Sequence, residues 1–341
     1  MDSTCESLKQ RSSKWDILKF ILIFLVVLGH MADYYTESCR SMRSLYLLVY
    51  TFHMPVFFFV SGLFSKRTVN EKRTEKIFGY LFLFVFMKVL TFILKMLDGQ
   101  NPRFMLFYGD GFSWYLIALA FSVMITMLFR NIPTKYILPF SIVVACFAGF
   151  DDSIGAFLSL SRLIAFYPFF YLGYSLERKD VESFVSGKTV KVCSAMIFAV
   201  FALIVFIKCD DIYWLRPLVT GTCSFSEIGV DSLMGAVMRL LYYAVVLLVG
   251  CSVVALIPCK TKSGTAEKLG QRTLSVYVFH YAVLFLLYNV LNVKSFFDGI
   301  FPNYGEWMII PLAFATTLLL SLKPINDFLM KIMNIPLKNK K

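Results

Sequence analysis

The chain has 341 residues, of which 58% are hydrophobic and only 16% are charged. An ordinary soluble domain carries roughly 25% charged residues, so the composition excludes that class. The formal net charge of +12 comes from short clusters of Lys and Arg between apolar stretches. That distribution is typical of membrane topology and argues against a nucleic-acid partner. The sequence therefore predicts an all-α polytopic integral membrane protein, with a single domain over residues 1–341.

Ten apolar segments predict transmembrane helices, because a helix that crosses a bilayer needs about 20 mostly apolar residues. The predicted spans are 15–35, 45–64, 77–96, 113–130, 135–150, 160–176, 189–208, 232–257, 273–293 and 306–326. The first carries internal charges and is followed by no small-residue cleavage site, so it is expected to be a retained span. The second contains Pro55, and we expect neighbouring helices to satisfy the backbone group that this proline frees.

The distribution of Lys and Arg predicts the orientation of these spans. With the N-terminus in the cytoplasm, cytoplasmic segments hold 23 of these residues, external loops hold seven, and four lie within spans. Cytoplasmic loops of membrane proteins are enriched in cations, so both termini are expected in the cytoplasm. Cys209 and Cys223 share one expected external loop, and sequence alone does not decide whether they form a disulfide.

The chain has three histidines, His30, His53 and His280, and all three fall within predicted spans. Ionisable groups inside a bilayer are costly and usually face a cavity or the interior of the bundle. A single such histidine is more often a hydrogen-bonded packing residue, and we favour that interpretation for His280. Three together, with none in a loop, favour a shared polar cavity. No two are three or four residues apart, so no metal site is predicted.

The first span places charges and an imidazole on one face. Lys19 and His30 are eleven residues apart, which puts them on nearly the same side of a helix, about 16 Å apart along its axis. Asp16 is one turn below Lys19 and can pair with it. The alternative for Lys19 is that its side chain extends to the cytoplasmic headgroups.

These residues resemble a known family. "WDILKFILIFLVVLGH" resembles the first span of the acyltransferase family three membrane proteins, whose signature of a basic residue, ten residues and His is Lys19-x10-His30 here. The family more often has Arg first, so Lys19 keeps the charge but loses the bidentate fork. "VYTFHMPVFFFVSGLFSKR" is similar to the second-span motif of the branch related to fucose O-acetylases. "SWYLIALAF", "RLIAFYPFFYLGYSL" and "LSVYVFHYAVLFLLY" match later family blocks in order.

The resemblance implies transfer of an acyl group, commonly acetyl, from cytoplasmic acyl-CoA to a carbohydrate hydroxyl. Acetyl-CoA or another acyl-CoA is then a co-substrate, and no permanently bound cofactor is expected. The acceptor would be a surface polysaccharide, such as capsule or O-antigen, or its lipid-linked precursor. The protein is expected to be a multi-pass protein of the inner (plasma) membrane of a bacterium.

His30 is the candidate catalytic base, because a positioned imidazole that removes the hydroxyl proton contributes roughly 10²–10⁴-fold to the rate. A covalent acyl-histidine is the rival mechanism and stays open. His53 lies at a similar depth, and its expected roles are to orient His30, bind acceptor or stabilise the oxyanion. Packing alone is the alternative for His53.

Acyl-CoA carries phosphates, and the cytoplasmic loop "SKRTVNEKRTEK" supplies cations suited to them. The candidate donor-binding residues there are Lys66, Arg67, Lys72, Arg73 and Lys76, with Lys19 and Asp16 deeper in the first span. On the external side, the candidate acceptor-binding residues are Asp110, Trp114 and Arg162. Plain topology and interfacial aromatic enrichment are the alternative explanations for the loop cations and for Trp114.

A transporter or flippase that uses buried Lys, Asp and His is the rival function. Many transporters contain inverted repeats with broken helices, and no internal repeat is evident here. A non-catalytic scaffold would leave three histidines within spans without a role.

Overall fold

The computed structural model describes residues 13–108, 111–222, 224–258, 264–302 and 304–333. In that part the chain is helical, apart from turns, loops and one isolated bridge between Tyr108 and Phe157. A helix lies at each of the ten predicted positions. These helices are α1 (Ser13–Asp33), α2 (Arg40–Leu63), α4 (Thr74–Leu97), α5 (Trp114–Phe129), α6 (Thr134–Ala148), α7 (Leu160–Ser175), α9 (Lys188–Ile207), α12 (Ser232–Leu256), α14 (Thr273–Phe285), which continues as a π-helical turn (Leu286–Val290), and α16 (Ile309–Leu320).

Shorter helices connect these elements. They are α3 (Lys66–Asn70), α8 (Arg178–Ser186), α10 (Cys209–Ile212), α11 (Arg216–Thr220), α13 (Thr265–Gly270), α15 (Val293–Ile300) and α17 (Lys323–Met333). Single 3₁₀ turns lie at Tyr213–Leu215, Ser226–Ile228 and Gly305–Met308.

Six helices of the described chain are long and apolar enough to cross a membrane: α1, α2, α4, α9, α12, and α14 with its π-helical turn. A seventh is counted if Gly305–Leu320 and α17, which meet at 59°, form one bent span. Helices α5 and α6 are apolar but shorter. The chain is therefore a polytopic helical membrane protein.

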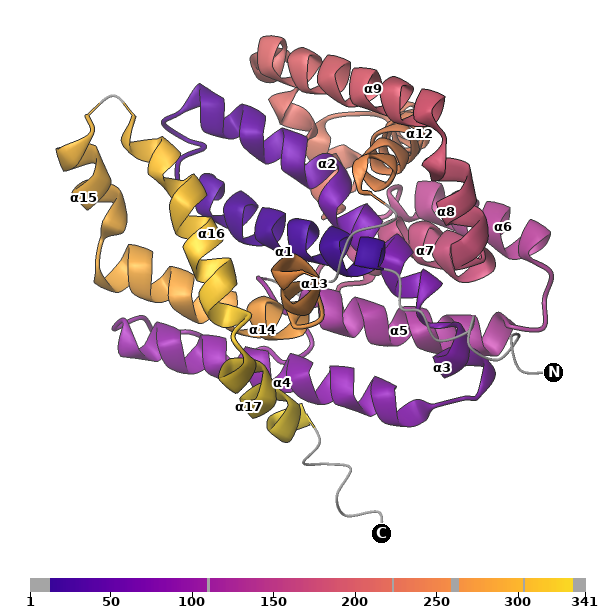
Figure 1. Ribbon diagram of the computed structural model, residues 1–341, viewed down its shortest axis with the longest axis horizontal. Helices are drawn as coiled ribbons and strands as arrows, with labels where there is room; N and C mark the ends of the chain where they lie inside the picture. The colour runs from indigo at the N-terminus through magenta and orange to yellow at the C-terminus, as the bar shows by residue number, and fades with distance from the viewer. Residues whose placement is uncertain (1–12, 109–110, 223, 259–263, 303, 334–341) are drawn as a thin grey trace.

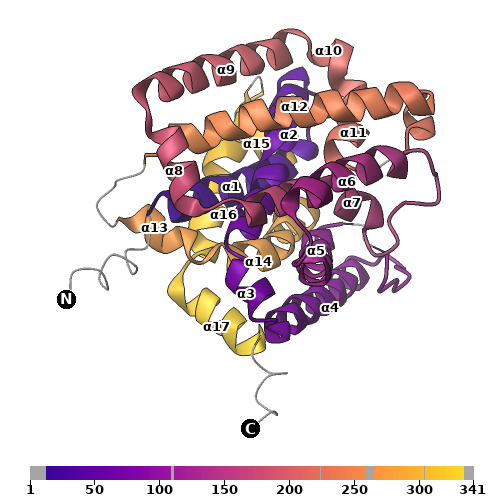
Figure 2. The same cartoon turned by 90° about the vertical axis from the view of Figure 1, so that its right-hand side faces the viewer.

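Helices α1 and α2 form the centre of the bundle. Figures 1 and 2 show α9 and α12 on one side of them and α4 and α17 on the other. In the most apolar 18-residue stretch of each helix, 72% of the residues are buried in α2 and 67% in α1, but only 11% in α9. The exposed face of α9 carries Val192, Met196, Val200, Leu203 and Ile207. Their spacing of three and four residues makes one apolar stripe, as expected of a helix that faces lipid.

Two glycines allow α2 and α7 to cross in close contact. A Cβ atom on Gly62 would lie 1.9 Å from the carbonyl oxygen of Phe170, and one on Gly173 would lie 2.0 Å from that of Phe59. Small residues at such crossings let helix backbones approach closely in membranes, where packing rather than the hydrophobic effect holds helices together. This crossing holds α7, which carries Arg162, against the central helix α2.

Pro55 lies inside α2, as expected, and cannot donate to the carbonyl of Thr51 one turn earlier. The single proton of the Tyr242 hydroxyl on α12 is shared between that carbonyl, at 3.4 Å, and the carbonyl of Val219, at 3.1 Å. A neighbouring helix therefore satisfies the freed backbone group, which confirms the expectation for this proline.

The beginning of α1 is anchored by two contacts. The buried ammonium of Lys14 donates to the carbonyls of Val254 and Ile257, at 2.6 and 2.7 Å, where α12 ends. Cations stabilise helix C-termini because the final carbonyls have no partner within the helix. Gly270, at the end of α13, lies so close to Asp16 that a Cβ atom would be 1.7 Å from the Asp16 carbonyl oxygen. The start of α14 is thereby held level with the first turns of α1.

Candidate active site

Three helices, α1, α2 and α14, each turn one face with polar and apolar residues toward a common interior. On α1 the lining residues include Lys19, Ile23, Val26 and His30, at intervals of four, three and four residues. This is the spacing of one helical face, so the shared face expected for Lys19 and His30 is confirmed. The corresponding faces of α2 and α14 include Tyr50, His53, Met54, Phe57 and Ser61, and Thr273, Leu274 and Tyr277.

Tyr50 contacts His30 and His53, and His280 reaches this group by stacking on His30. The Nδ1 atom of His30 is 3.0 Å from the Tyr50 hydroxyl, and the rings of Tyr50 and His53 lie 4.7 Å apart. The His30 ring stacks on that of His280, with centroids 5.3 Å apart and planes inclined by 23°, and its other neighbour is Phe112 at 4.3 Å. His280 is fully buried and lines neither of the two cavities described below, so its ring packs against His30 away from them.

Backbone carbonyls define which nitrogen carries the proton in two of these rings. The Nδ1–H of His53 donates to the carbonyl of Val49 at 2.8 Å, and the Nδ1–H of His280 donates to that of Tyr277 at 2.7 Å. In a neutral imidazole the other nitrogen is then an acceptor. Both rings therefore present Nε2 lone pairs, and among the described residues the buried Nε2 of His280 has no hydrogen-bond partner. For His30, donation of Nδ1–H to the Tyr50 oxygen would likewise leave Nε2 as a base.

The first cavity, called here the histidine cavity, has a volume of about 380 Å³. His30 and His53 line it, together with an ion pair between Asp33 and Arg216 at 2.7 Å. The Arg216 guanidinium also lies 4.5 Å from the centre of the Tyr46 ring, which lines the same cavity. The cavity thus combines imidazoles, one carboxylate, guanidinium donors and aromatic faces, a combination suited to a polar ligand with several hydroxyls.

Two of the three predicted acceptor-binding residues line this cavity. Trp114 is the first residue of α5, Arg162 belongs to α7, and the Arg162 guanidinium lies 4.8 Å from the centre of the Trp114 ring. Asp110, the third, lies outside the described residues, as does Cys223 of the predicted cysteine pair.

The second cavity, called here the lysine cavity, has a volume of about 290 Å³ and lies toward the beginning of α1. Lys19 lines it and forms an ion pair with Asp16 at 2.6 Å, as its position one turn away predicts. The Lys19 ammonium also lies 5.6 Å from the centre of the Phe64 ring, and the guanidinium of Arg178 lies 5.2 Å from that same ring. Lys19 is therefore held at the cavity wall by a carboxylate and an aromatic face.

The five cations predicted to bind the donor, which lie between α2 and the first turn of α4, have different environments. Lys76 lines the lysine cavity. Lys66 pairs with Glu177, and its hydrogen bond lowers the pKa of the Glu177 carboxyl below its ordinary value. Arg67 pairs with Glu71 at 2.9 Å, while Lys72 and Arg73 precede α4 and line neither cavity. The structure thus brings Lys76, but not the whole cluster, to the Lys19 site.

The two cavities meet end to end. Val26, Met54 and Tyr277 are the three residues that line both of them. The Tyr277 hydroxyl donates to the carbonyl of Phe112 and accepts from the backbone N–H of Tyr115 at 3.3 Å. These three side chains, called here the partition, lie between the lysine cavity and the histidine cavity.

Sequence reasoning missed the place of His280. His280 is fewer residues from the cytoplasmic end of its predicted span than His30 is from the end of its own. That comparison gives relative depth only if both spans begin at the same depth in the membrane. Because Gly270 holds the start of α14 against α1, the two rings come into contact. Sequence reasoning also missed the pair of Asp33 and Arg216, which joins residues 183 positions apart. Tyr50, four residues before Met54 and three before His53, could have been found from helical spacing.

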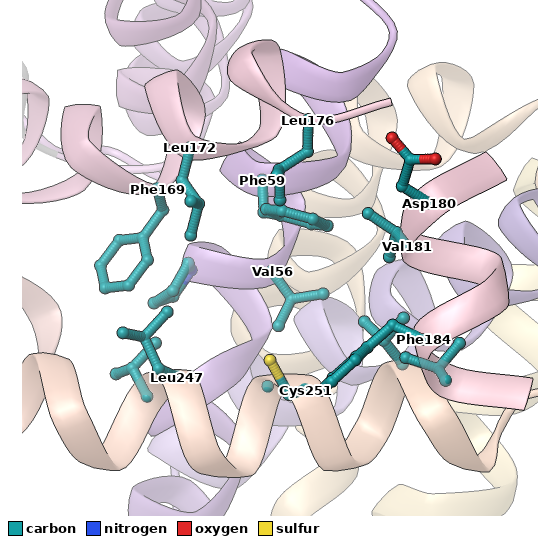
Figure 3. A pocket seen from close by; sticks show the side chains of 15 residues that line it. Val56, Phe59, Phe169, Leu172, Leu176, Asp180, Val181, Phe184, Leu247 and Cys251 are labelled. Carbon is teal, nitrogen blue, oxygen red and sulfur yellow. The ribbon is translucent and has the colours of Figure 1, made fainter. Parts of the chain in front are cut away.

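A third cavity, of about 270 Å³, lies between α2, α7, α8 and α12, and Figure 3 shows its side chains. Its lining is apolar except for Asp180 at one edge and the thiol of Cys251. It shares no lining residue with the other two cavities. It therefore does not belong to the histidine-centred site.

The fold and the site define a polytopic membrane protein with a buried cluster of histidines between two polar cavities. The chain belongs to acyltransferase family 3: the model of the acyltransferase domain matches residues 13–323. It is 26% identical over 326 residues to nodulation protein NolL of Sinorhizobium fredii (strain NBRC 101917 / NGR234), a match that covers 85% of this chain and 82% of that protein. No solved structure gave a significant match. The resemblance seen in the sequence is confirmed, and the protein is a membrane acyltransferase.

Proposed function

We propose that this protein transfers an acetyl group from cytoplasmic acetyl-CoA to a hydroxyl of a surface polysaccharide or of its lipid-linked precursor. The observation that carries the proposal is the end-to-end arrangement of the two cavities. One contains Lys19 and Lys76, and the other contains His30 and His53. A donor with phosphates and an acceptor with hydroxyls can then approach one reaction centre from opposite sides.

The dimensions of α1 support donor entry at the lysine cavity. Val26 is seven residues beyond Lys19 and His30 is eleven, which correspond to about 10 and 16 Å along the helix axis. The pantetheine arm contains two amide units and is comparable in length to a four-residue extended peptide, about 14 Å. A diphosphate held near Lys19 and Lys76 would then place the thioester between Val26 and His30. Candidate residues for the phosphates also include Arg178, beside Phe64, which sequence reasoning did not single out.

The chemistry beside the thioester uses the His30 tautomer in which Nδ1–H donates to the Tyr50 oxygen and Nε2 is free to act as a base. The Nε2 atom of His30 takes the proton of the acceptor hydroxyl as the hydroxyl oxygen attacks the thioester carbonyl carbon. The C–S bond then breaks, the new ester forms, and the proton passes from His30 to the departing CoA thiolate. Tyr50 and His280 hold the His30 ring, while Trp114, Arg162, Asp33 and Arg216 line the space for the acceptor.

In this proposal all ten helices cross the membrane, both termini are cytoplasmic, and the protein lies in a bacterial inner membrane. The lysine cavity then opens toward the cytoplasm, where acyl-CoA is made, and the histidine cavity opens toward the outer face. The split of 23 cytoplasmic to seven external Lys and Arg residues supports this orientation.

The test uses purified protein in liposomes, radiolabelled acetyl-CoA and a panel of bacterial surface glycans and lipid-linked oligosaccharides. We expect label in an alkali-labile ester on one glycan class, and we expect the His30→Asn variant to lose it. Unmodified glycan carried across the membrane, with no label in any ester, would replace the proposal by the transporter function.

A further inference from the structure

We propose that Met54 is a gate between the lysine and histidine cavities, and that Met54 and Val26 together set the largest acyl group the protein transfers. This inference rests on the proposed function, because it concerns the acyl group that passes from donor to acceptor. It starts from the partition, whose three side chains close the path at the level where the thioester is expected.

The three side chains of the partition differ in how freely they move. Tyr277 is held by the carbonyl of Phe112 and the N–H of Tyr115. Val26 is branched at Cβ, which leaves it one preferred rotamer in a helix. Met54 is unbranched, with three rotatable bonds and a polarisable thioether, and no hydrogen bond restrains its side chain. Met54 is therefore the part of the partition that can swing aside without breaking a polar contact.

The position of Met54 connects the gate to the reaction. It follows His53 directly and lies one helical turn from Tyr50, which contacts His30. Val26 lies one turn below His30 on the same face of α1. A thioester that displaces the Met54 side chain thus arrives beside both imidazoles. Its acyl group must fit between Val26, the fixed Tyr277 ring and the displaced thioether.

A closed partition also has a protective effect. The histidine cavity is the side from which the acceptor and water arrive in the proposed mechanism. Val26 and Met54 are buried apolar side chains, and Tyr277 is buried with its hydroxyl already engaged. They separate water in the histidine cavity from a thioester waiting in the lysine cavity. The gate would therefore limit hydrolysis of acyl-CoA in the absence of acceptor, because excluding water prevents side reactions.

The first experiment compares acetyl-, propionyl- and butyryl-CoA as donors for wild type and for Met54→Ala, Val26→Ala and Met54→Leu. A pocket discriminates against one methylene by roughly 10-fold or more, so wild type should prefer acetyl strongly. We expect Met54→Ala and Val26→Ala to reduce the preference for acetyl over butyryl by about 10-fold. Met54→Leu, which nearly conserves volume, should retain it. Met87→Ala, which removes a buried methionine that lines neither cavity, is the control for general destabilisation.

The second experiment does not depend on transfer. Ser61 lines the lysine cavity only, so a Ser61→Cys variant reports on access from the histidine cavity. A small charged methanethiosulfonate reagent is added on the external side of sealed vesicles, and modification at position 61 is followed by mass spectrometry. We expect modification to be about 10-fold faster when Met54→Ala is added to Ser61→Cys.

The outcomes separate the two ideas. Active variants with an unchanged donor preference and unchanged modification at position 61 would overturn the gate and leave the acyltransferase intact. Absence of transfer in wild type, with faster modification in the Met54→Ala background, would overturn the proposed function and retain the gate between the cavities.

Discussion

The His30 imidazole is held on several sides before any substrate arrives. Tyr50 contacts its Nδ1 atom, His280 stacks on one face, and Phe112 packs beside it. Catalytic side chains act best when packing and hydrogen bonds lock their orientation. Within the described part of the chain the buried Nε2 of His280 has no hydrogen-bond partner, and His280 supports His30 through the stacking of the two rings.

The His30→Asn variant should lose at least about 10² of the transfer rate, because asparagine cannot accept the hydroxyl proton. The measurement is the rate per folded molecule, with folding checked by size-exclusion chromatography and thermal melting in detergent. Turnover near that of wild type would show that the imidazole only packs.

Lys19 tests the lysine cavity. The Lys19→Gln variant should raise the Michaelis constant for acetyl-CoA, because in the proposed function this cation contacts the donor in both the ground and the transition state. Lys19→Arg keeps the charge and should retain most activity. Asp16→Asn should have a smaller effect, through looser placement of Lys19. The assay measures transfer per inserted molecule, and an unchanged constant in Lys19→Gln would exclude Lys19 from donor binding.

Helix packing determines whether these residues meet. The crossing of α2 and α7 joins the helix of Tyr50 and His53 to the helix of Arg162. Its two glycines approach the carbonyls of the opposite helix so closely that no Cβ atom fits. The backbone must therefore move if either glycine is replaced.

The Gly173→Ala variant should destabilise the protein by about 1–3 kcal/mol, the usual cost of adding atoms to a well-packed interior. Gly299→Ala is the matched control, because that glycine is also helical and a Cβ atom there would meet nothing within 4 Å. Thermal melting in detergent compares the two. Equal melting temperatures would contradict the close crossing.

At the scale of the whole molecule, topology is the test of the proposed direction of transfer. Helices α5, α6 and α7 have 16, 15 and 16 residues, which is short for a span of about 20. The ten-span arrangement requires the loop between α5 and α6 to be cytoplasmic and the loop between α6 and α7 to be external.

Cysteine labelling distinguishes the arrangements. An impermeant thiol reagent added outside intact cells should modify Gly155→Cys and Asn101→Cys, and should spare Asn131→Cys and Lys72→Cys until the cells are opened. The same labelling for Asn131→Cys and Gly155→Cys would mean that α6 does not cross. External labelling of Lys72→Cys would reverse the orientation and with it the assignment of the donor side.

The sequence by itself determined the helices and one face of α1. Helix positions follow from the length of apolar runs, and the pair of Asp16 and Lys19 follows from helical spacing, so both are local properties. The family signature of Lys19 and His30 is local in the same sense. Local patterns also singled out Trp114 and Arg162 as candidates for acceptor binding, and the structure brings both to the histidine cavity.

Only the tertiary structure decided which distant residues meet. The stacking of His280 on His30 depends on the level at which α14 begins, which Gly270 sets by its contact with α1. The ion pair of Asp33 with Arg216, and the partition of Val26, Met54 and Tyr277, join helices far apart in the chain. Helix levels and crossings depend on close packing of backbones and side chains between elements. The periodicity within one helix carries no information about them.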